Sequence, residues 1–189
     1  SVGFSKDIVY RNKAKLNDDI YVTGNLGDSF VGLNILQNKI KTNKKLKTYF
    51  VKKYFEPEIQ INLTKELIKF ANSSIDISDG LIDDLQKMIN RQKLSYNIWE
   101  EKIPISKNLH IYLNKNDLKK SNFISNGDDY QILFTASPDK SRIIKNTSKK
   151  LGIKISKIGK INSNKNKSFL INQKGVYLLV KNSGYKHQF

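Results

Sequence analysis

Residues 74–91 place a strand, a turn and a helix in direct succession, and this order constrains the fold more than any other feature. Residues 74–77 (Ser-Ile-Asp-Ile) alternate polar and apolar side chains, as a half-buried strand does. The next three residues, Ser-Asp-Gly, have the composition of a turn. Apolar residues then recur at helical spacing over 80–91. A chain with such a unit must build a β-sheet and cover it with helices.

The rest of the chain repeats this mixture of short strands and helices. Further strands are expected over 19–23, 94–99, 129–135, 153–160, 167–171 and 175–181, and helices over 30–36, 39–55, 63–71 and 138–150, with short helical segments near 106–120. Asp28 or Ser29 is expected to cap the helix over 30–36, and Pro57 to stop the helix over 39–55. Strands and helices do not alternate strictly, and no repeat or linker divides the chain. We therefore predict one α+β domain with a mixed sheet covered by helices.

Composition excludes several classes of protein. The 189 residues include no Cys, so disulfides, cysteine zinc sites and thiol catalysis are excluded. Only two His are present, His110 and His187, and their separation argues against an all-protein zinc site or a Ser-His-Asp triad. No apolar run reaches the ~18–20 residues of a membrane span. Without a recognisable signal peptide, the chain is predicted to be cytoplasmic.

The net charge of +17 comes from 34 basic and 17 acidic residues, which is typical of proteins that bind nucleic acid or an anionic surface. However, 31 of the basic residues are Lys and only 3 are Arg, the residue that base-reading sites favour. The chain is also rich in Asn (21) and Ile (24), and A/T-rich codons encode these residues together with Lys. We interpret most of the positive charge as a consequence of A/T-rich codon usage, which places additional lysines on solvent-exposed faces. A nucleic-acid surface and an anionic small-molecule ligand remain alternatives.

The acidic residues are clustered in this basic chain. Four of the twelve Asp fall within the nine residues 76–84. The predicted strand delivers Asp76 to its end, and the helix N-terminus that follows offers free N–H groups to a phosphate. Two carboxylates, Asp76 and Asp79, could hold Mg²⁺ beside a polyphosphate. In the alternative, Ser78 and Asp79 cap the helix, while Asp83 and Asp84 complement its dipole.

Two other loops carry candidate groups. Residues 126–130 (Asn-Gly-Asp-Asp-Tyr) place two acids where a turn enters a strand, a pattern also typical of Asn-Gly and Asx turns. Residues 23–29 (Thr-Gly-Asn-Leu-Gly-Asp-Ser) resemble a phosphate-binding loop but lack the G-x-x-x-x-G-K-[ST] pattern. Each loop alone is a weak indicator of function.

Taken in order, these segments resemble the C-terminal part of the thiamine-monophosphate kinase family, which belongs to the superfamily of aminoimidazole ribonucleotide synthetase and selenophosphate synthetase. Residues 11–24 resemble the family's R-S-G-A-K-P-G-D-x-I-Y-V-T-G and run into L-G-D-S. Residues 75–81 match I-D-I-S-D-G-L, and residues 127–130 are similar to G-E-D-Y. Residues 184–189 are similar to a terminal G-aromatic-x-H-F. The agreement in order and spacing covers nearly the whole chain.

The resemblance implies a Mg²⁺-dependent transfer of the γ-phosphoryl group of ATP, the co-substrate, to thiamine monophosphate, giving thiamine diphosphate. The acceptor oxygen is already ionised, so no catalytic base is assigned. The resemblance also implies binding roles for six residues. Asp76 and Asp79 would bind Mg²⁺, Arg11 and Ser78 would bind ATP, and Asp128 and Tyr185 would bind thiamine monophosphate.

The chain departs from the family pattern at four places. Asp128 stands where the family has a Glu, and Gln131 replaces another Glu. Residues 55–58 read Phe-Glu-Pro-Glu in place of P-x-P-R, so that an acidic residue replaces a basic one. One extra residue precedes Phe189 in the terminal motif.

The resemblance also implies that residues 1–189 form a single C-terminal domain like that of aminoimidazole ribonucleotide synthetase. Residues 1–18 would be the segment that joins it to an N-terminal domain, absent here, which supplies most Mg²⁺ ligands and forms the family's homodimer. The chain alone is then expected to be inactive. A related superfamily enzyme with another substrate, or a basic nucleic-acid-binding module, is the alternative.

Overall fold

Seven strands form one mixed sheet in the computed structural model, which describes residues 7–90, 92–163 and 167–179. The strands are β1 (Asp19–Thr23), β2 (Ala71–Asp76), β3 (Leu94–Trp99), β4 (Ile132–Ala136), β5 (Ile155–Ser163), β6 (Phe169–Ile171) and β7 (Tyr177–Leu179). Their order across the sheet is β2-β4-β1-β5-β3-β6-β7. Neighbours pair antiparallel except β3 and β6, which are parallel. The predicted α+β class with a mixed sheet is confirmed.

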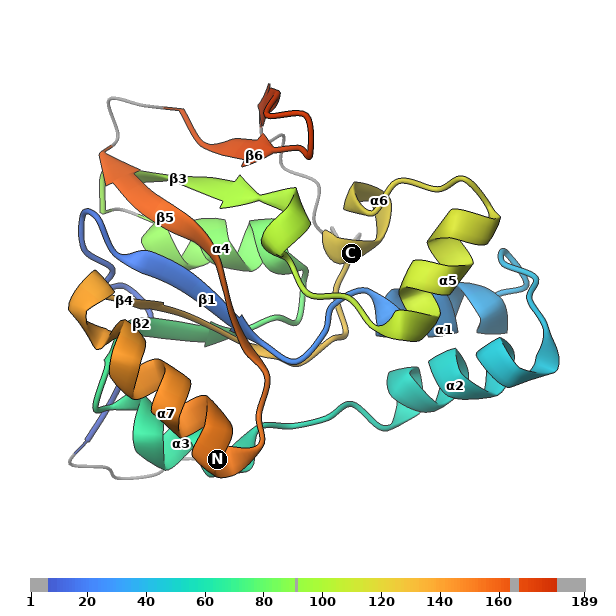
Figure 1. Cartoon of the computed structure of the whole chain (residues 1–189), viewed down its shortest axis with the longest axis horizontal. Coiled ribbons are helices and arrows are strands. Elements are labelled where there is room, and N and C mark those ends of the chain that lie inside the picture. The colour runs from blue at the N-terminus through green and yellow to red at the C-terminus, as the bar shows by residue number, and fades with distance from the viewer. Residues whose placement is uncertain (1–6, 91, 164–166, 180–189) are drawn as a thin grey trace, which may run out of the picture.

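Helices cover both faces of this sheet. They are α1 (Asp28–Leu36), α2 (Lys44–Phe55), α3 (Ile61–Leu67), α4 (Leu81–Ile89), α5 (Lys107–Lys115), α6 (Ser121–Ile124) and α7 (Ser141–Leu151), with 3₁₀ turns at Glu100–Lys102 and Pro138–Lys140. Helix α4 lies on one face, and α3 and α7 lie on the other (Figure 1). The helices α1, α2, α5 and α6 gather beyond one end of the strands (Figure 1).

The central strand β1 supplies both layers of the core because its side chains alternate. Ile20 and Val22 are fully buried in the apolar cluster that includes α4. Tyr21 points to the opposite cluster and stacks on Phe134, with ring centroids 5.2 Å apart. A third cluster surrounds the fully buried Phe50 among the helices at the end of the sheet. Each face of β1 therefore anchors a different group of helices.

Two predicted helix starts are wrong for identifiable reasons. Helix α1 begins at Asp28 after Gly27, which has a φ of 88° and takes the N-cap position, so neither Asp28 nor Ser29 caps it. The Asp28 carboxylate instead accepts hydrogen bonds from the hydroxyls of Tyr49 (2.8 Å) and Ser106 (2.7 Å). Helix α2 begins only at Lys44, because Asn43 Oδ1 accepts the N–H of Leu46 at 3.0 Å. Its predicted end before Pro57 is confirmed.

Two other boundaries were also misplaced. The helix predicted over 63–71 spans Ile61–Leu67, and Ala71 already pairs with β4. The strand predicted over 129–135 begins at Ile132, because Asp128 and Tyr130 have φ values of 68° and 50°, outside the extended region. In residues 7–90, 92–163 and 167–179, no helix combines the length and apolar character needed to cross a membrane.

The close approach of α1 and α2 depends on Gly32. A methyl group at Gly32 would lie 2.3 Å from the backbone oxygen of Phe50. Ala normally favours a helix over Gly, but this clash reverses the preference. We expect Gly32→Ala to lower the free energy of unfolding by about 1–3 kcal/mol in urea denaturation. Lys47→Ala, at an exposed position of α2, should change it by less than about 0.5 kcal/mol, and equal effects would contradict this account.

Candidate functional site

The loop that joins β2 to α4 is held by the carboxylate of Asp84. Asp84 Oδ2 accepts the backbone N–H groups of residues 78–80 at 2.9–3.1 Å, and the side chain is only 1% exposed. Gly80, at the N-cap with a φ of 122°, contributes no side-chain cap. Ser78 and Asp79 therefore do not cap the helix, contrary to the alternative considered above. Asp84 has a structural role, as the same alternative predicted. It acts by binding the backbone of the loop, in addition to any interaction with the helix dipole.

A second loop, residues 126–130, lies directly on the first. The backbone N–H of Asp128 donates to the backbone carbonyl oxygen of Ser78 at 3.0 Å. The backbone N–H of Tyr130 donates to the backbone carbonyl oxygen of Ile77 at 2.9 Å. A side chain at Gly127 would lie 2.0 Å from the Ser78 oxygen, so only glycine allows this approach. The two loops that carry the predicted Asp ligands are thus side by side.

The charges of the two loops act on one another. Burial, followed by the nearby charge of Asp79, raises the pKa of Asp128. Burial raises the pKa of Tyr130, and the charges of Asp128, Asp76 and Asp79 raise it further. Tyr130 is 40% exposed and Asp76 is also exposed. The carboxylates of Asp76, Asp79 and Asp128 thus each lie near enough to Tyr130 for their charges to act on its hydroxyl group.

Asp129 ties the second loop to the loop over residues 23–29. Its side chain is buried, and its two oxygens accept the N–H of Gly27 at 3.1 and 2.8 Å. Burial raises the pKa of Asp129 well above its usual value, and the neighbouring charges of Asp28 and Asp128 act in the same direction. The N–H of Gly27 is therefore used within the fold, so this loop does not offer it to a phosphate.

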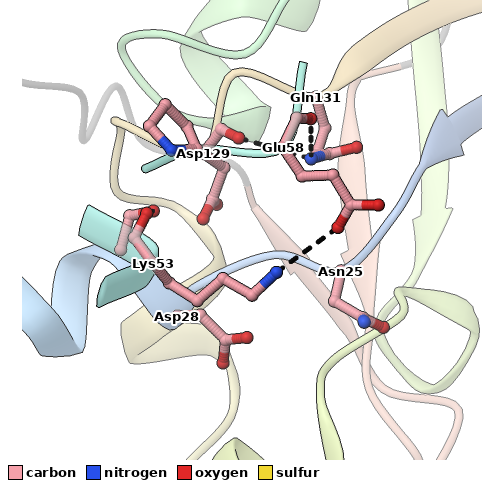
Figure 2. Close-up of a pocket in the computed structure, with 8 residues that line it drawn as sticks. Asn25, Asp28, Lys53, Glu58, Asp129 and Gln131 are labelled. Carbon is pink, nitrogen blue, oxygen red and sulfur yellow. Dashed lines mark hydrogen bonds and ion pairs between the residues drawn. The ribbon is translucent and has the colours of Figure 1, made fainter. Parts of the chain in front are cut away.

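A small cavity of about 30 Å³ lies between these loops. Figure 2 shows its lining side chains Asn25, Asp28, Lys53, Glu58, Asp129 and Gln131. The cavity has room for about one water molecule, which is too little for a substrate phosphate. This part of the fold therefore connects the neighbouring loops and offers no cavity of substrate size.

The same region explains one departure from the family pattern. The side-chain amide nitrogen of Gln131 donates to the Glu58 backbone oxygen at 3.1 Å (Figure 2). The side-chain oxygen of Gln131 accepts a hydrogen bond from the Thr23 hydroxyl at 2.8 Å. A Glu at this position could accept but not donate at neutral pH. The Glu58 carboxylate, which stands in place of the family's basic residue, pairs with Lys53 at 3.3 Å.

A larger hollow of about 600 Å³ opens beside the end of β2. Its lining includes Asp76, residues of α3, and Asp7 and Val9 of the N-terminal segment. Arg11 follows in the same segment and is exposed. Its backbone carbonyl oxygen accepts a hydrogen bond from the Ser73 hydroxyl at 2.7 Å. The predicted nucleotide ligand Arg11 therefore belongs to a segment that runs along β2.

The structure brings most of the predicted site residues into one region. Asp76, Ser78, Asp79 and Asp128 lie on the two paired loops, and Arg11 is on the adjacent segment. Tyr185 lies outside the described residues. Sequence reasoning missed Lys87, whose ammonium group contacts both Asp79 and Asp84. Its i,i+3 spacing from Asp84 is the signal that could have identified it.

The residues present suit part of a Mg²⁺ site. Carboxylate oxygens are ligands that Mg²⁺ prefers, and the side chains of Asp76 and Asp79 both reach solvent. In the part of the chain that the structure describes, no three Asp, Glu, His or Cys side chains converge to hold a metal ion. The donor set therefore fits Mg²⁺ but needs further ligands, from water, phosphates or another domain.

Comparison of the fold with solved structures defines its class. The chain superposes on a structure of the HypE-HypF complex with a TM-score of 0.71 at 14% identity, over 90% of this chain and 54% of the other. At that identity only the fold is shared. The chain has an aminoimidazole ribonucleotide synthetase-like α+β fold, as predicted.

No model of a known protein family matches the chain, but individual proteins with higher sequence identity do. The thiamine-monophosphate kinase of Buchnera aphidicola subsp. Schizaphis graminum is 38% identical over 184 residues, covering 96% of this chain and 56% of that enzyme. The structure of AaThiL complexed with AMPPCP and TMP matches with a TM-score of 0.78 at 28% identity, over 94% of this chain and 53% of the other. The chain is a homologue of the thiamine-monophosphate kinases, and it spans about half of their length.

The role of Asp84 can be tested against its neighbour Asp83. Asp84→Ala removes the acceptor of three N–H groups and should lower the free energy of unfolding by about 2–3 kcal/mol. Asp83 has a buried Oδ1 without a hydrogen-bond partner, so Asp83→Ala should be neutral or stabilising. Urea denaturation of both variants checks this, and a larger loss in Asp83→Ala would refute the assignment.

Asp129 should make stability depend on pH. Because its pKa is higher in the folded than in the unfolded state, its contribution is greatest below about pH 3.8 and is lost as pH rises through the folded pKa. Asp129→Asn cannot ionise and escapes this loss. We expect the stability of the variant relative to the wild type to increase with pH in urea denaturation. A difference that is constant across pH would contradict the assignment.

Proposed function

We propose that this chain is part of a thiamine-monophosphate kinase and carries the half of the active site built on the loops over residues 76–79 and 127–130. The observation that carries the proposal is the pairing of these two loops, which brings Asp76, Asp79 and Asp128 to one surface. The homology to thiamine-monophosphate kinases over 96% of the chain supports the same activity.

The homologous AaThiL has been solved in complex with AMPPCP, an ATP analogue, and TMP. We infer from this relative that the substrates are ATP and thiamine monophosphate. Asp76 and Asp79 would hold Mg²⁺, which, when bound, neutralises phosphate charge. Ser78 and Arg11 would contact the nucleotide. Asp128 would contact thiamine monophosphate, as would Tyr185.

The transfer needs positioning more than acid–base chemistry. A phosphate oxygen of thiamine monophosphate forms a bond to the γ-phosphorus of ATP, while the bond from that phosphorus to the bridging oxygen breaks. ADP leaves with the electron pair, and no proton has to move. The chain's own contribution would be to position the two substrates, with Ser78 contacting the nucleotide and Asp128 contacting thiamine monophosphate.

The backbone around Asp128 is held by contacts to the neighbouring loop. The left-handed φ of 68° at Asp128, the hydrogen bond from its N–H to Ser78 and the buried neighbour Asp129 fix the position of its backbone. An Asp can therefore serve where the family has a Glu only if the substrate reaches one methylene deeper. Asp128→Glu tests this point directly.

The proposed site is incomplete in this chain. Most family ligands for Mg²⁺ and the family's homodimer interface would belong to an N-terminal domain, so the chain alone should produce no thiamine diphosphate. A related superfamily enzyme with another substrate is the second candidate, but the homologues named thiamine-monophosphate kinase favour the first. They also favour it over a nucleic-acid-binding module.

Calorimetric titration of thiamine monophosphate in the presence of Mg²⁺ and AMPPCP tests the proposal. We expect Asp128→Ala to weaken binding of thiamine monophosphate by about 1–3 kcal/mol, because it removes a polar contact at the substrate. Asp76→Asn should instead weaken the Mg²⁺-dependent binding of AMPPCP. Asp139→Asn alters an exposed carboxylate on a remote 3₁₀ turn and should change neither affinity.

Each outcome has a separate meaning. Equal affinities in Asp128→Ala and in the Asp139→Asn control would contradict the proposed substrate contact. Binding of another phosphate ester in preference to thiamine monophosphate would favour the second candidate. Formation of thiamine diphosphate from ATP by this chain alone would contradict the proposal that the site is incomplete.

A further inference from the structure

Lys87 places a positive charge inside the acidic cluster. It lies in the last turn of α4, and its ammonium group contacts Asp79 Oδ2 and lies 2.9 Å from Asp84 Oδ1. In residues 7–90, 92–163 and 167–179, Lys87 is the cation paired with Asp79, and no ion pair forms at Asp76 or Asp128. One ammonium group thus bridges the fixed carboxylate and the proposed Mg²⁺ ligand.

Asp84 determines where this ammonium group lies. Its Oδ2 is bound by three backbone N–H groups and its side chain is 1% exposed, so it cannot move to follow a partner. The remaining oxygen, Oδ1, holds Lys87 beside the loop. The side chains of Lys87 and Asp79 are 37% and 33% exposed, so the pair between them can open to solvent while Lys87 stays anchored on Asp84.

Lys87 and a divalent cation compete for the same carboxylate. Mg²⁺ requires near-ideal octahedral geometry and short contacts to oxygen, which an ammonium group on the same oxygen obstructs. The two cations also repel each other at that distance. Asp79 can therefore coordinate a metal through this oxygen only after Lys87 has withdrawn, and Asp84 provides an acceptor to which it can withdraw.

We propose that Lys87 is an internal competitor of Mg²⁺, occupying Asp79 until a divalent cation displaces it and so lowering the affinity of the proposed metal site. This inference rests on the proposed function, since it takes Asp79 as a metal ligand. It assigns Lys87 a positioning role that acts through Asp79. The pair also neutralises part of the repulsion between Asp79 and Asp128 when no metal is bound.

Mn²⁺ is a suitable probe, because it broadens amide NMR signals near its site and reports even weak binding. Broadening of residues 78–80 would be followed in the wild-type chain, Lys87→Met and Lys87→Arg. We expect Lys87→Met to bind Mn²⁺ about two- to fivefold more tightly, the effect of removing a part-exposed ion pair. Lys87→Arg keeps the charge and should retain the wild-type affinity.

Lys69→Met is the matched control, because it removes an i,i+3 ion pair with Glu66 away from the cluster and changes the net charge equally. It should leave Mn²⁺ binding unchanged, so any effect of total charge is separated from the local one. Thermal melting of all variants, together with the amide spectrum without Mn²⁺, verifies that the loop over residues 78–80 remains folded. Lys87→Gln serves in place of Lys87→Met if the latter does not fold.

The outcomes separate this inference from the proposed function. Unchanged or weaker Mn²⁺ binding in Lys87→Met overturns the competition. If Lys87→Met gives that result but Asp79→Asn abolishes the broadening, Asp79 remains a metal ligand and only the competition by Lys87 is overturned. If no variant, Lys87→Met included, shows broadening at residues 78–80, the competition is overturned, because Asp79 then binds no metal in this chain for Lys87 to compete with.

Discussion

The carboxylate of Asp84 is the constraint on which the proposed site depends. It lies buried under the turn between β2 and α4 and accepts three successive backbone N–H groups, from residues 78–80. These groups belong to the N-cap residue Gly80 and the two residues before it, so an N-cap side chain, which accepts the N–H of the second or third helical residue, would not satisfy them. Here Asp84, a residue within the helix, satisfies them, so neither Ser78 nor Asp79 is needed for this role, and Asp79 pairs with Lys87. The loop can therefore be rigid and still present polar groups to a ligand.

The second loop depends on the same principle. Asp129 is buried and binds the N–H of Gly27, which holds residues 127–130 against β1 and α1. The adjacent Asp128 and Tyr130 are thereby kept in left-handed backbone conformations beside Ser78. A buried carboxylate with a raised pKa reduces stability at neutral pH. We interpret this as the cost of placing two acidic loops edge to edge at the surface.

Local sequence patterns predicted the helices, strands and motifs. The features that they missed depend on contacts between residues far apart in the sequence. The change from strand to helix period across residues 78–80 located Asp76 at the end of β2. The ordered motifs indicated a resemblance to the thiamine-monophosphate kinases, and a relative of that name is 38% identical over 96% of this chain. The predicted cap of α1 was wrong because Asp28 binds Ser106, 78 residues away. The late start of β4 follows from contacts between residues 128–130 and the β2–α4 loop, which spacing along the chain does not reveal.

The central claim is that the loops over residues 76–79 and 127–130 form one ligand surface. Titration of the ¹⁵N-labelled chain with thiamine monophosphate and Mg²⁺, followed by amide NMR, tests it most directly. Our account predicts that the largest shifts fall on these two loops and that shifts on both loops follow one binding curve. Shifts confined to the lysine-rich helix α2, or separate curves for the two loops, would contradict it.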